Sequence, residues 1–316
     1  MRLDDIRRSS NIEDRRSGGG GLGGSGGGGG PRLPLRGRGG IAMIVVVLLL
    51  VFFGGGDTMG TLMSILGAGS NASSGPASQS DSFQPDASQP KGLDQQANSS
   101  RSVAMTADRV SAVLGSTEDF WSAHFAKNGA TYEPPTLVLF DGQTGSPCGT
   151  ASASTGPFYC PGDQKIYLDM SFFEEMERGL GAKGDFAQAY VIAHEVAHYV
   201  QDVTGILPKA NRAMRERGEN KGADSIAVRI ELQADCYAGI WAAQSNIAQA
   251  LEPGDIEEAL GAASAVGDDR LQKRVQGFAV PDSFTHGTSA QRVAWFKRGL
   301  ETTNLRGCDT FSARDL

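Results

Sequence analysis

The sequence lacks any surplus of positive charge. It contains 29 Lys and Arg residues against 36 Asp and Glu residues, for a formal net charge of -7. Residues 1–40 hold eight arginines and only four acidic residues, so the rest of the chain carries about -11 by subtraction. A nucleic-acid-binding protein needs a basic surface to neutralise phosphates, and we therefore expect no nucleic-acid partner.

Histidine and cysteine are scarce, with four residues of each. No two cysteines have the C-x-x-C spacing of structural zinc sites, which excludes a zinc site made of cysteines. An even number of cysteines instead suits disulfides. Cys148 and Cys160 bracket a Gly/Ser/Thr-rich loop and most simply pair with each other, which leaves Cys236 for Cys308; the two other pairings remain open.

Long apolar runs are absent, with one exception. The segment IAMIVVVLLLVFF at 41–53 holds 13 apolar residues, and the uncharged stretch around it would be about 27 Å long as a helix. We predict a transmembrane helix over 39–57 that anchors the chain in a lipid bilayer, although a buried helix or a cleaved signal segment would also fit. Arginines precede the run and Asp57 follows it, so the positive-inside rule places the N-terminus in the cytoplasm and the rest of the chain outside, where disulfides form.

Glycine is abundant, at 43 residues, and much of the excess lies before residue 70. Over 1–38 we predict a disordered Gly/Arg-rich cytoplasmic leader, because such a sequence cannot bury enough apolar surface to fold. A flexible linker rich in Ser, Gln, Pro and Asn is expected over 58–104. The folded domain is then expected at 105–316.

The pattern of this domain is mostly helical, with a few short strands. Threonine caps followed by glycine predict two helices, one ending at Gly115 and one at Gly129. TLVLF at 136–140 and KIYLD at 165–169 are typical of strands, and GPFYC at 156–160 is a third candidate. Capping boxes predict four further helix starts, at Ser171, Asp185, Asp255 and Thr288.

The stretch AYVIAHEVAHYVQ at 189–201 carries the strongest chemical signal. Its H-E-x-x-H pattern places His194 and His198 on one face of a helix, where both rings can reach one ion. Glu195 lies one step round the helix and can reach a water on that ion. The pattern predicts a site for one Zn²⁺ per chain, with two unrelated helix histidines as the alternative.

A catalytic zinc ion needs a third protein ligand and one open position. The long zincin pattern would place a histidine where the chain has Thr204, so that subclass is excluded. ELQAD instead supplies Glu231 and Asp235, four residues apart in a helical pattern over 223–245. We predict that Glu231 binds the metal and that Asp235 orients His194 through its other ring nitrogen; a solvated helix face is the alternative.

HEVAHYVQ, followed by ELQADCYAG and DSFTHGTSAQR, resembles the bacterial neutral zinc metallopeptidase family. NIEDRR, the Gly-rich leader, the apolar run and GPFYCPGDQKIYLD are similar to that family too. The resemblance implies an α+β, zincin-like fold, mostly helical with a small mixed sheet whose edge strand binds peptide. KIYLD is our candidate for that strand. The resemblance also implies Glu231 as the third ligand and Asp235 as the residue that orients a histidine.

The resulting prediction is a metallopeptidase anchored in a bacterial inner membrane, acting on a peptide or protein substrate outside the cytoplasm. A zinc-bound water would attack the scissile carbonyl after Glu195 takes its proton. His286, Tyr190 and Tyr199 are candidate donors to the developing oxyanion, and we favour His286 because it lies in a predicted loop. The alternatives are a membrane-tethered binding or scaffold protein with a structural or vestigial zinc site, and a zinc hydrolase of small amides or esters.

Overall fold

The computed structural model describes residues 1–16, 105–152, 155–218, 220–302 and 304–316. The predicted span at 39–57, the linker at 58–104 and the leader from residue 17 lie outside these ranges. No helix in the described part of the chain is long and apolar enough to cross a membrane. The described fold is α+β, mostly helical with a small mixed sheet, as predicted.

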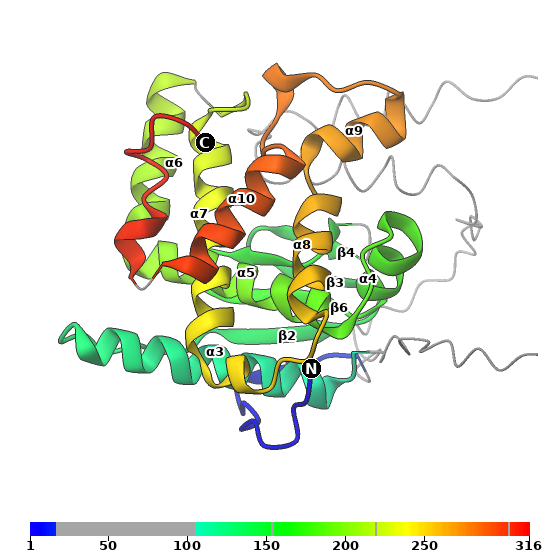
Figure 1. Cartoon of the computed structure of the whole chain (residues 1–316), viewed down its shortest axis with the longest axis vertical. Coiled ribbons are helices and arrows are strands. Elements are labelled where there is room, and N and C mark those ends of the chain that lie inside the picture. Colours follow the sequence, from blue (N-terminus) through cyan, green and yellow to red (C-terminus); the bar gives the residue numbers. More distant parts are fainter. Residues whose placement is uncertain (17–104, 153–154, 219, 303) are drawn as a thin grey trace, which may run out of the picture. The chain divides into compact units, whose positions relative to one another are not determined.

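The helices form most of the domain. They are α3 (Ala107–Lys127), α4 (Ser171–Glu175), α5 (Asp185–Val203), α6 (Ile206–Arg217), α7 (Ile226–Gln244), α8 (Asp255–Ala265), α9 (Asp268–Gln276) and α10 (Ser289–Glu301). Figure 1 shows α5, α7, α8 and α10 gathered around the centre, with α3 crossing below them. α7 and α10 pack so closely that a Cβ on Gly239 would overlap the Phe296 carbonyl oxygen. Glycine at this position therefore allows the two helices to meet.

The sheet has four strands in the order β1 (Ile12–Asp14), β2 (Thr136–Phe140), β6 (Lys165–Asp169) and β5 (Phe158–Cys160). β1, β2 and β6 are parallel, and β5 is antiparallel to β6. β3 (Gln143–Ser146) and β4 (Gly149–Ser152) form a separate antiparallel pair. The bounds predicted for TLVLF and KIYLD are confirmed. KIYLD is not an edge strand, however, because β2 and β5 pair with it on either side.

Residues 1–16 are part of this fold, which corrects the prediction of disorder for them. β1 extends the sheet beside β2, with Ile12 opposite Leu137. α3 also continues through Gly115, where the sequence predicted a helix end. A Cβ on Gly115 would overlap the Arg7 carbonyl oxygen. The glycine therefore permits the N-terminal segment to lie against α3 and does not stop the helix.

The predicted capping boxes have mixed outcomes. Thr288 and Gln291 form one, as expected. The other three helices begin at the predicted residues, Ser171, Asp185 and Asp255, but without a capping box, because the cap positions before them make no side-chain cap hydrogen bond. Asp185 and Asp255 instead face the amino group of Met1, at 3.0 and 3.1 Å. The starts of α5 and α8 are thus joined through the N-terminal segment.

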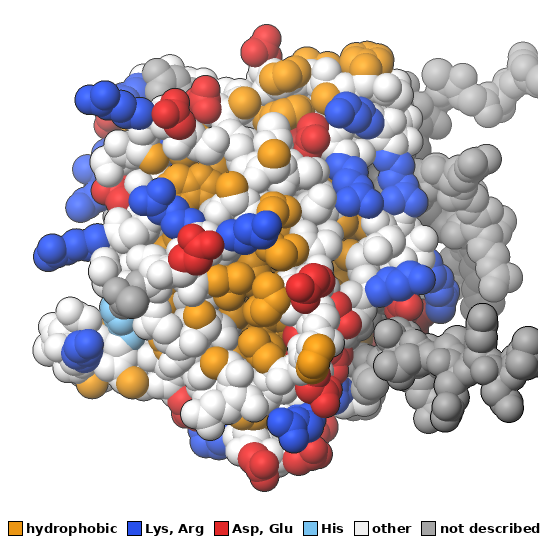
Figure 2. Space-filling model, in the orientation of Figure 1, with side chains coloured by type: hydrophobic (Ala, Val, Ile, Leu, Met, Phe, Trp, Pro, Cys, Tyr) orange, Lys and Arg blue, Asp and Glu red, His pale blue; other side chains and the backbone are white. Residues whose placement is uncertain are grey.

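A hydrophobic core joins side chains from the sheet and from α3, α5, α7, α8 and α10. Trp241, Trp295 and Phe296 belong to this core and are at most 4% exposed. On the face shown in Figure 2, charged side chains of both signs are interspersed around apolar ones.

Both predicted disulfides are confirmed. Cys148–Cys160 joins the turn between β3 and β4 to β5, and Cys236–Cys308 joins α7 to the segment after α10. The second bond lies directly beside Asp235, one of the predicted site residues.

Candidate metal centre

Three side chains that can bind a metal ion converge where α5 faces α7. His194 and His198 on α5 have their Nε2 atoms 3.1 Å apart. On α7, one oxygen of Glu231 lies 3.3 Å from Nε2 of His194, and the other lies 3.5 Å from Nε2 of His198. The structure therefore brings the three predicted ligands together.

The spacing of these atoms fits zinc. With tetrahedral geometry and bonds of about 2.0–2.1 Å, neighbouring ligand atoms stand about 3.3 Å apart. The distance of 3.1 Å between the two Nε2 atoms, and the distances of 3.3 and 3.5 Å from these atoms to the two Glu231 oxygens, bracket that value. Two histidines and one carboxylate are also a donor set that zinc uses in hydrolytic enzymes, where the fourth position stays open.

The outer ring nitrogen of each histidine has its own acceptor. His194 Nδ1 donates to Asp235 and His198 Nδ1 donates to Gln201, each at 2.9 Å. These bonds keep a proton on each Nδ1, so that Nε2 is the nitrogen of each ring that can bind a metal ion at the common centre. Burial lowers the pKa of His198 to about 4 and keeps its ring neutral. Burial also disfavours the charged form of His194, but the hydrogen bond and the charge of Asp235 outweigh the effect of burial and raise the pKa of His194 to about 9. A metal ion must displace that proton.

Asp235 is itself held by an arginine. The Arg292 guanidinium, on α10, donates to both carboxylate oxygens of Asp235 at 2.9 Å. Tyr190 donates its hydroxyl to the same carboxylate at 2.5 Å. Although burial alone would raise it, the charge of Arg292 and the hydrogen bond from His194 hold the pKa of Asp235 below its ordinary value. The carboxylate that orients His194 therefore stays ionised.

Glu195 lies beside the three ligands and is suited to proton transfer. Its side chain is buried, and its carboxylate accepts a hydrogen bond from the backbone of Tyr159 on β5. Burial and then the nearby charge of Glu231 raise the pKa of Glu195 to about 7, even though His194 acts in the opposite direction. A carboxyl group with a pKa near neutrality can both take up and release a proton at physiological pH.

A cavity of about 400 Å³ opens onto this centre. His194, Glu195, His198 and Glu231 all border it. Apolar side chains also line it, among them Phe158, Phe172, Met176, Leu207 and Leu271. The centre is therefore reached from a mostly apolar hollow.

His286 borders the same cavity, from the loop before α10. The Nδ1 atom of His286 lies 3.1 Å from one carboxylate oxygen of Asp268. The other oxygen of Asp268 accepts hydrogen bonds from the three backbone N–H groups of residues 285–287. Burial opposes the charged form, but the charge and hydrogen bond of Asp268 outweigh it and raise the pKa of His286. Glu231 adds to this rise and Arg292 acts against it.

The two tyrosines predicted as alternative donors use their hydroxyl groups elsewhere. Tyr190 donates to Asp235, and Tyr199 donates to the backbone carbonyl of Glu133. Of the three candidates, His286 is therefore the one whose donor group, the Nε2 side of its ring, remains available to a substrate.

Sequence reasoning missed Arg292, Gln201 and Asp268. Arg292 had a usable signal, because it lies three and four residues before Trp295 and Phe296 on the buried side of α10. A buried arginine almost always has an acidic partner. Gln201 and Asp268 carried no such signal, since polar residues at a helix end or start are usually solvated.

Comparison with known proteins agrees with this geometry. A family model described as "Putative neutral zinc metallopeptidase" matches residues 1–311. The chain is 49% identical over 220 residues to the uncharacterized protein YpfJ of Escherichia coli (strain K12), a match that covers 68% of the chain and 76% of that relative. It is 45% identical over 196 residues to the uncharacterized protein Rv2575 of Mycobacterium tuberculosis, covering 58% of the chain and 65% of that relative. No solved structure matches the chain.

Proposed function

The chain belongs to the neutral zinc metallopeptidase family, and we propose that it is an active zinc peptidase whose centre is formed by His194, His198 and Glu231. The observation that carries this proposal is the close approach of the two histidine Nε2 atoms and the two Glu231 oxygens, at 3.1 to 3.5 Å, beside the buried Glu195. A purely structural zinc ion would have four protein ligands and no use for a general base.

The side chains around the cavity have distinct roles in peptide hydrolysis. A bound zinc ion would polarise the scissile carbonyl and lower the pKa of water. Glu195 takes the proton of the attacking water and passes it to the leaving amine. His286 donates from Nε2 to the carbonyl oxygen as negative charge develops there, while Asp268 holds its Nδ1. Asp235 keeps His194 in one orientation throughout.

The cavity indicates how a peptide would lie. Its apolar lining suits a large apolar side chain next to the scissile bond. β5 borders the cavity through Phe158 and Tyr159, and it replaces KIYLD as the strand beside the substrate.

We also place the domain outside the cytoplasm. Two disulfides support this location, because such bonds persist in oxidising compartments. Attachment to a membrane through 39–57 belongs to the same proposal and is supported by the apolar sequence of that segment. Since β1 pairs with β2, residues 1–16 lie on the same side of the membrane as the domain, and the segment is proposed as an anchor and not as a single crossing.

The test compares the parent with Glu195→Gln. Both proteins must be full-length, because a fragment that starts near residue 101 would lack β1. Elemental analysis should find one zinc per chain in both, and cleavage of casein should fall roughly 10²- to 10⁴-fold in the variant. Zinc in both without cleavage in either would favour the scaffold alternative. Absence of zinc from the parent would remove the metal centre altogether.

A further inference from the structure

A chain of hydrogen bonds connects His198 to the segment that follows α10. Gln201, which accepts from His198 Nδ1 at 2.9 Å, donates its own amide to Gln233 Oε1 at 3.0 Å. Gln233, on α7, donates its amide to the Cys308 backbone carbonyl at 3.1 Å. Three bonds thus lead from a proposed metal ligand to the residue that forms a disulfide with Cys236.

The direction of this chain is fixed because both glutamines are buried. Gln201 is 0% exposed and Gln233 is 3% exposed. The Gln201 amide also donates to the Ile230 carbonyl at 2.8 Å. If the amide group were rotated by 180°, its NH₂ group would face the N–H of His198, and its oxygen would face the Ile230 carbonyl and Gln233 Oε1, so that all three hydrogen bonds would be lost. A buried group without a partner costs about 1–3 kcal/mol. Gln201 Oε1 therefore faces His198 and keeps the proton on Nδ1.

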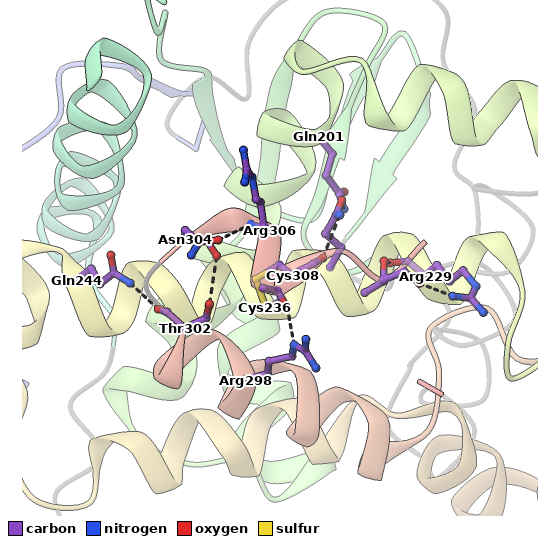
Figure 3. The surroundings of a disulfide bond; sticks show 12 residues. Gln201, Arg229, Cys236, Gln244, Arg298, Thr302, Asn304, Arg306 and Cys308 are labelled. Atoms are coloured by element: carbon purple, nitrogen blue, oxygen red, sulfur yellow. Dashed lines mark hydrogen bonds between the residues drawn. A yellow bond between two sulfur atoms is a disulfide. The ribbon is translucent and has the colours of Figure 1, made fainter. Parts of the chain in front are cut away.

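The far end of the chain is anchored by a covalent bond. The Cys236–Cys308 disulfide fastens the segment 305–313 onto α7, and Figure 3 shows the labelled side chains around it. Arg229, on α7, also holds this segment by hydrogen bonds. Its guanidinium donates to the Ala313 carbonyl at 3.0 Å, and its backbone carbonyl accepts from Thr310 Oγ1 at 2.7 Å. Without the disulfide, the Cys308 carbonyl would be held only by non-covalent contacts.

We propose that Gln201 and Gln233 are positioning residues through which the Cys236–Cys308 disulfide holds His198 ready to bind zinc. This inference rests on the proposed zinc site. With Cys236 and Cys308 as thiols, the Cys308 carbonyl moves more freely, Gln233 and Gln201 lose their fixed orientation, and His198 loses its preference for a lone pair on Nε2. The metal centre therefore reaches full affinity only after this disulfide has formed.

The experiment measures zinc affinity by competition with a chromogenic chelator, on full-length protein. Gln233→Met keeps the side-chain volume and removes both hydrogen bonds. Gln244→Met is its matched control, because Gln244 is also on α7 and also donates to a backbone carbonyl after α10, that of Thr302 at 2.6 Å. We expect affinity to fall roughly 3- to 30-fold in Gln233→Met, roughly 10- to 100-fold in Gln201→Met, and not to change in Gln244→Met.

A second pair of variants tests the disulfide. Cys236→Ala/Cys308→Ala should lose zinc affinity as Gln233→Met does. Cys148→Ala/Cys160→Ala should keep its zinc affinity, because that disulfide borders the proposed substrate side of the cavity, at β5, and includes none of the residues of the hydrogen-bond chain; peptidase activity is therefore not the measure for this control. The visible absorption of Co²⁺ bound in place of zinc should change in the first double variant and stay unchanged in the second. This spectrum reports the ligand geometry and is independent of peptidase activity.

The outcomes separate this inference from the proposed function. If the parent binds zinc and Gln201→Met, Gln233→Met and Cys236→Ala/Cys308→Ala bind it equally well, the hydrogen-bond chain has no positioning role while the zinc site stands. If Gln233→Met does not fold, the comparison of the two double-cysteine variants decides the question. If the parent binds no zinc, both proposals fail.

Discussion

Replacing Arg292 should destabilise the domain far more than replacing an exposed arginine. Its guanidinium donates to both oxygens of Asp235 at 2.9 Å, and the two side chains are 5% and 0% exposed. Removing one partner of a buried ion pair costs roughly 3–5 kcal/mol, because the other charge is left unpaired. At roughly 2–4 °C per kcal/mol for a domain of this size, Arg292→Met should lower the melting temperature by roughly 6–20 °C.

The assays are thermal unfolding, which gives the melting temperature, and urea unfolding, which gives the free energy, both on full-length protein in excess chelator so that metal binding does not contribute. Arg178→Met is the matched control, since Arg178 pairs with Glu174 on the surface with side chains 76% and 67% exposed. It should change the free energy of unfolding by at most about 0.5 kcal/mol. Arg292→Met/Asp235→Asn should recover part of the loss, because no unpaired charge remains. A loss below about 1 kcal/mol in Arg292→Met would refute the argument from burial.

Three further predictions concern the ligand, the histidine of the loop and the N-terminal segment. Glu231→Ala should lose its zinc on dialysis, and full occupancy by elemental analysis would exclude this residue as the third ligand. Because folding raises the pKa of His286, this residue stabilises the fold below about pH 6.5, and that contribution is lost as the pH rises through the pKa of His286 in the folded protein. Because folding lowers the pKa of Asp268, the contribution of Asp268 is lost as the pH falls through the pKa of Asp268 in the folded protein. Asp268→Asn should therefore lower the free energy of unfolding more at about pH 5.5 than at about pH 9. The same loss at both pH values would contradict the pairing of Asp268 with a charged His286. In intact cells, a membrane-impermeant maleimide should label Asp5→Cys and Arg178→Cys alike, because both positions are exposed on the same domain; labelling of only one would show that the N-terminal segment lies elsewhere.

Local patterns predicted the elements whose signal is contained in a few adjacent residues. TLVLF and KIYLD have the predicted bounds, and the helix around His194 begins at the predicted residue, Asp185. The two carboxylates on α7 were found because zinc chemistry demands a third ligand and helical spacing places Glu231 and Asp235 on one face. The prediction of Glu231 and Asp235 was possible because few residue types can bind zinc or orient a histidine that does.

The failures share one cause, which is contact with a distant segment. Gly115 suggests a helix end until Arg7 is known to lie against it, and Asp185 suggests a cap until the Met1 amino group is known to lie beside it. KIYLD carries nothing in its own sequence that shows which strands flank it. Each of these features depends on residues outside the local pattern, since even β5, the nearer neighbour of KIYLD, lies before it in the sequence and pairs with it only in the fold.

The N-terminal segment also changes what the charge distribution means. The arginines that precede the apolar run at 41–53 predicted a cytoplasmic N-terminus. Nearer the start of the chain, Arg7 and Arg8 pair with Glu118 and Asp108 on α3, at 2.7 and 2.8 Å. Because β1 pairs with β2, residues 1–16 and the domain at 105–316 must lie on the same side of any membrane. A cytoplasmic N-terminus with an external domain, joined by a single crossing, does not fit this pairing, so the location outside the cytoplasm that we propose for the domain would apply to residues 1–16 as well.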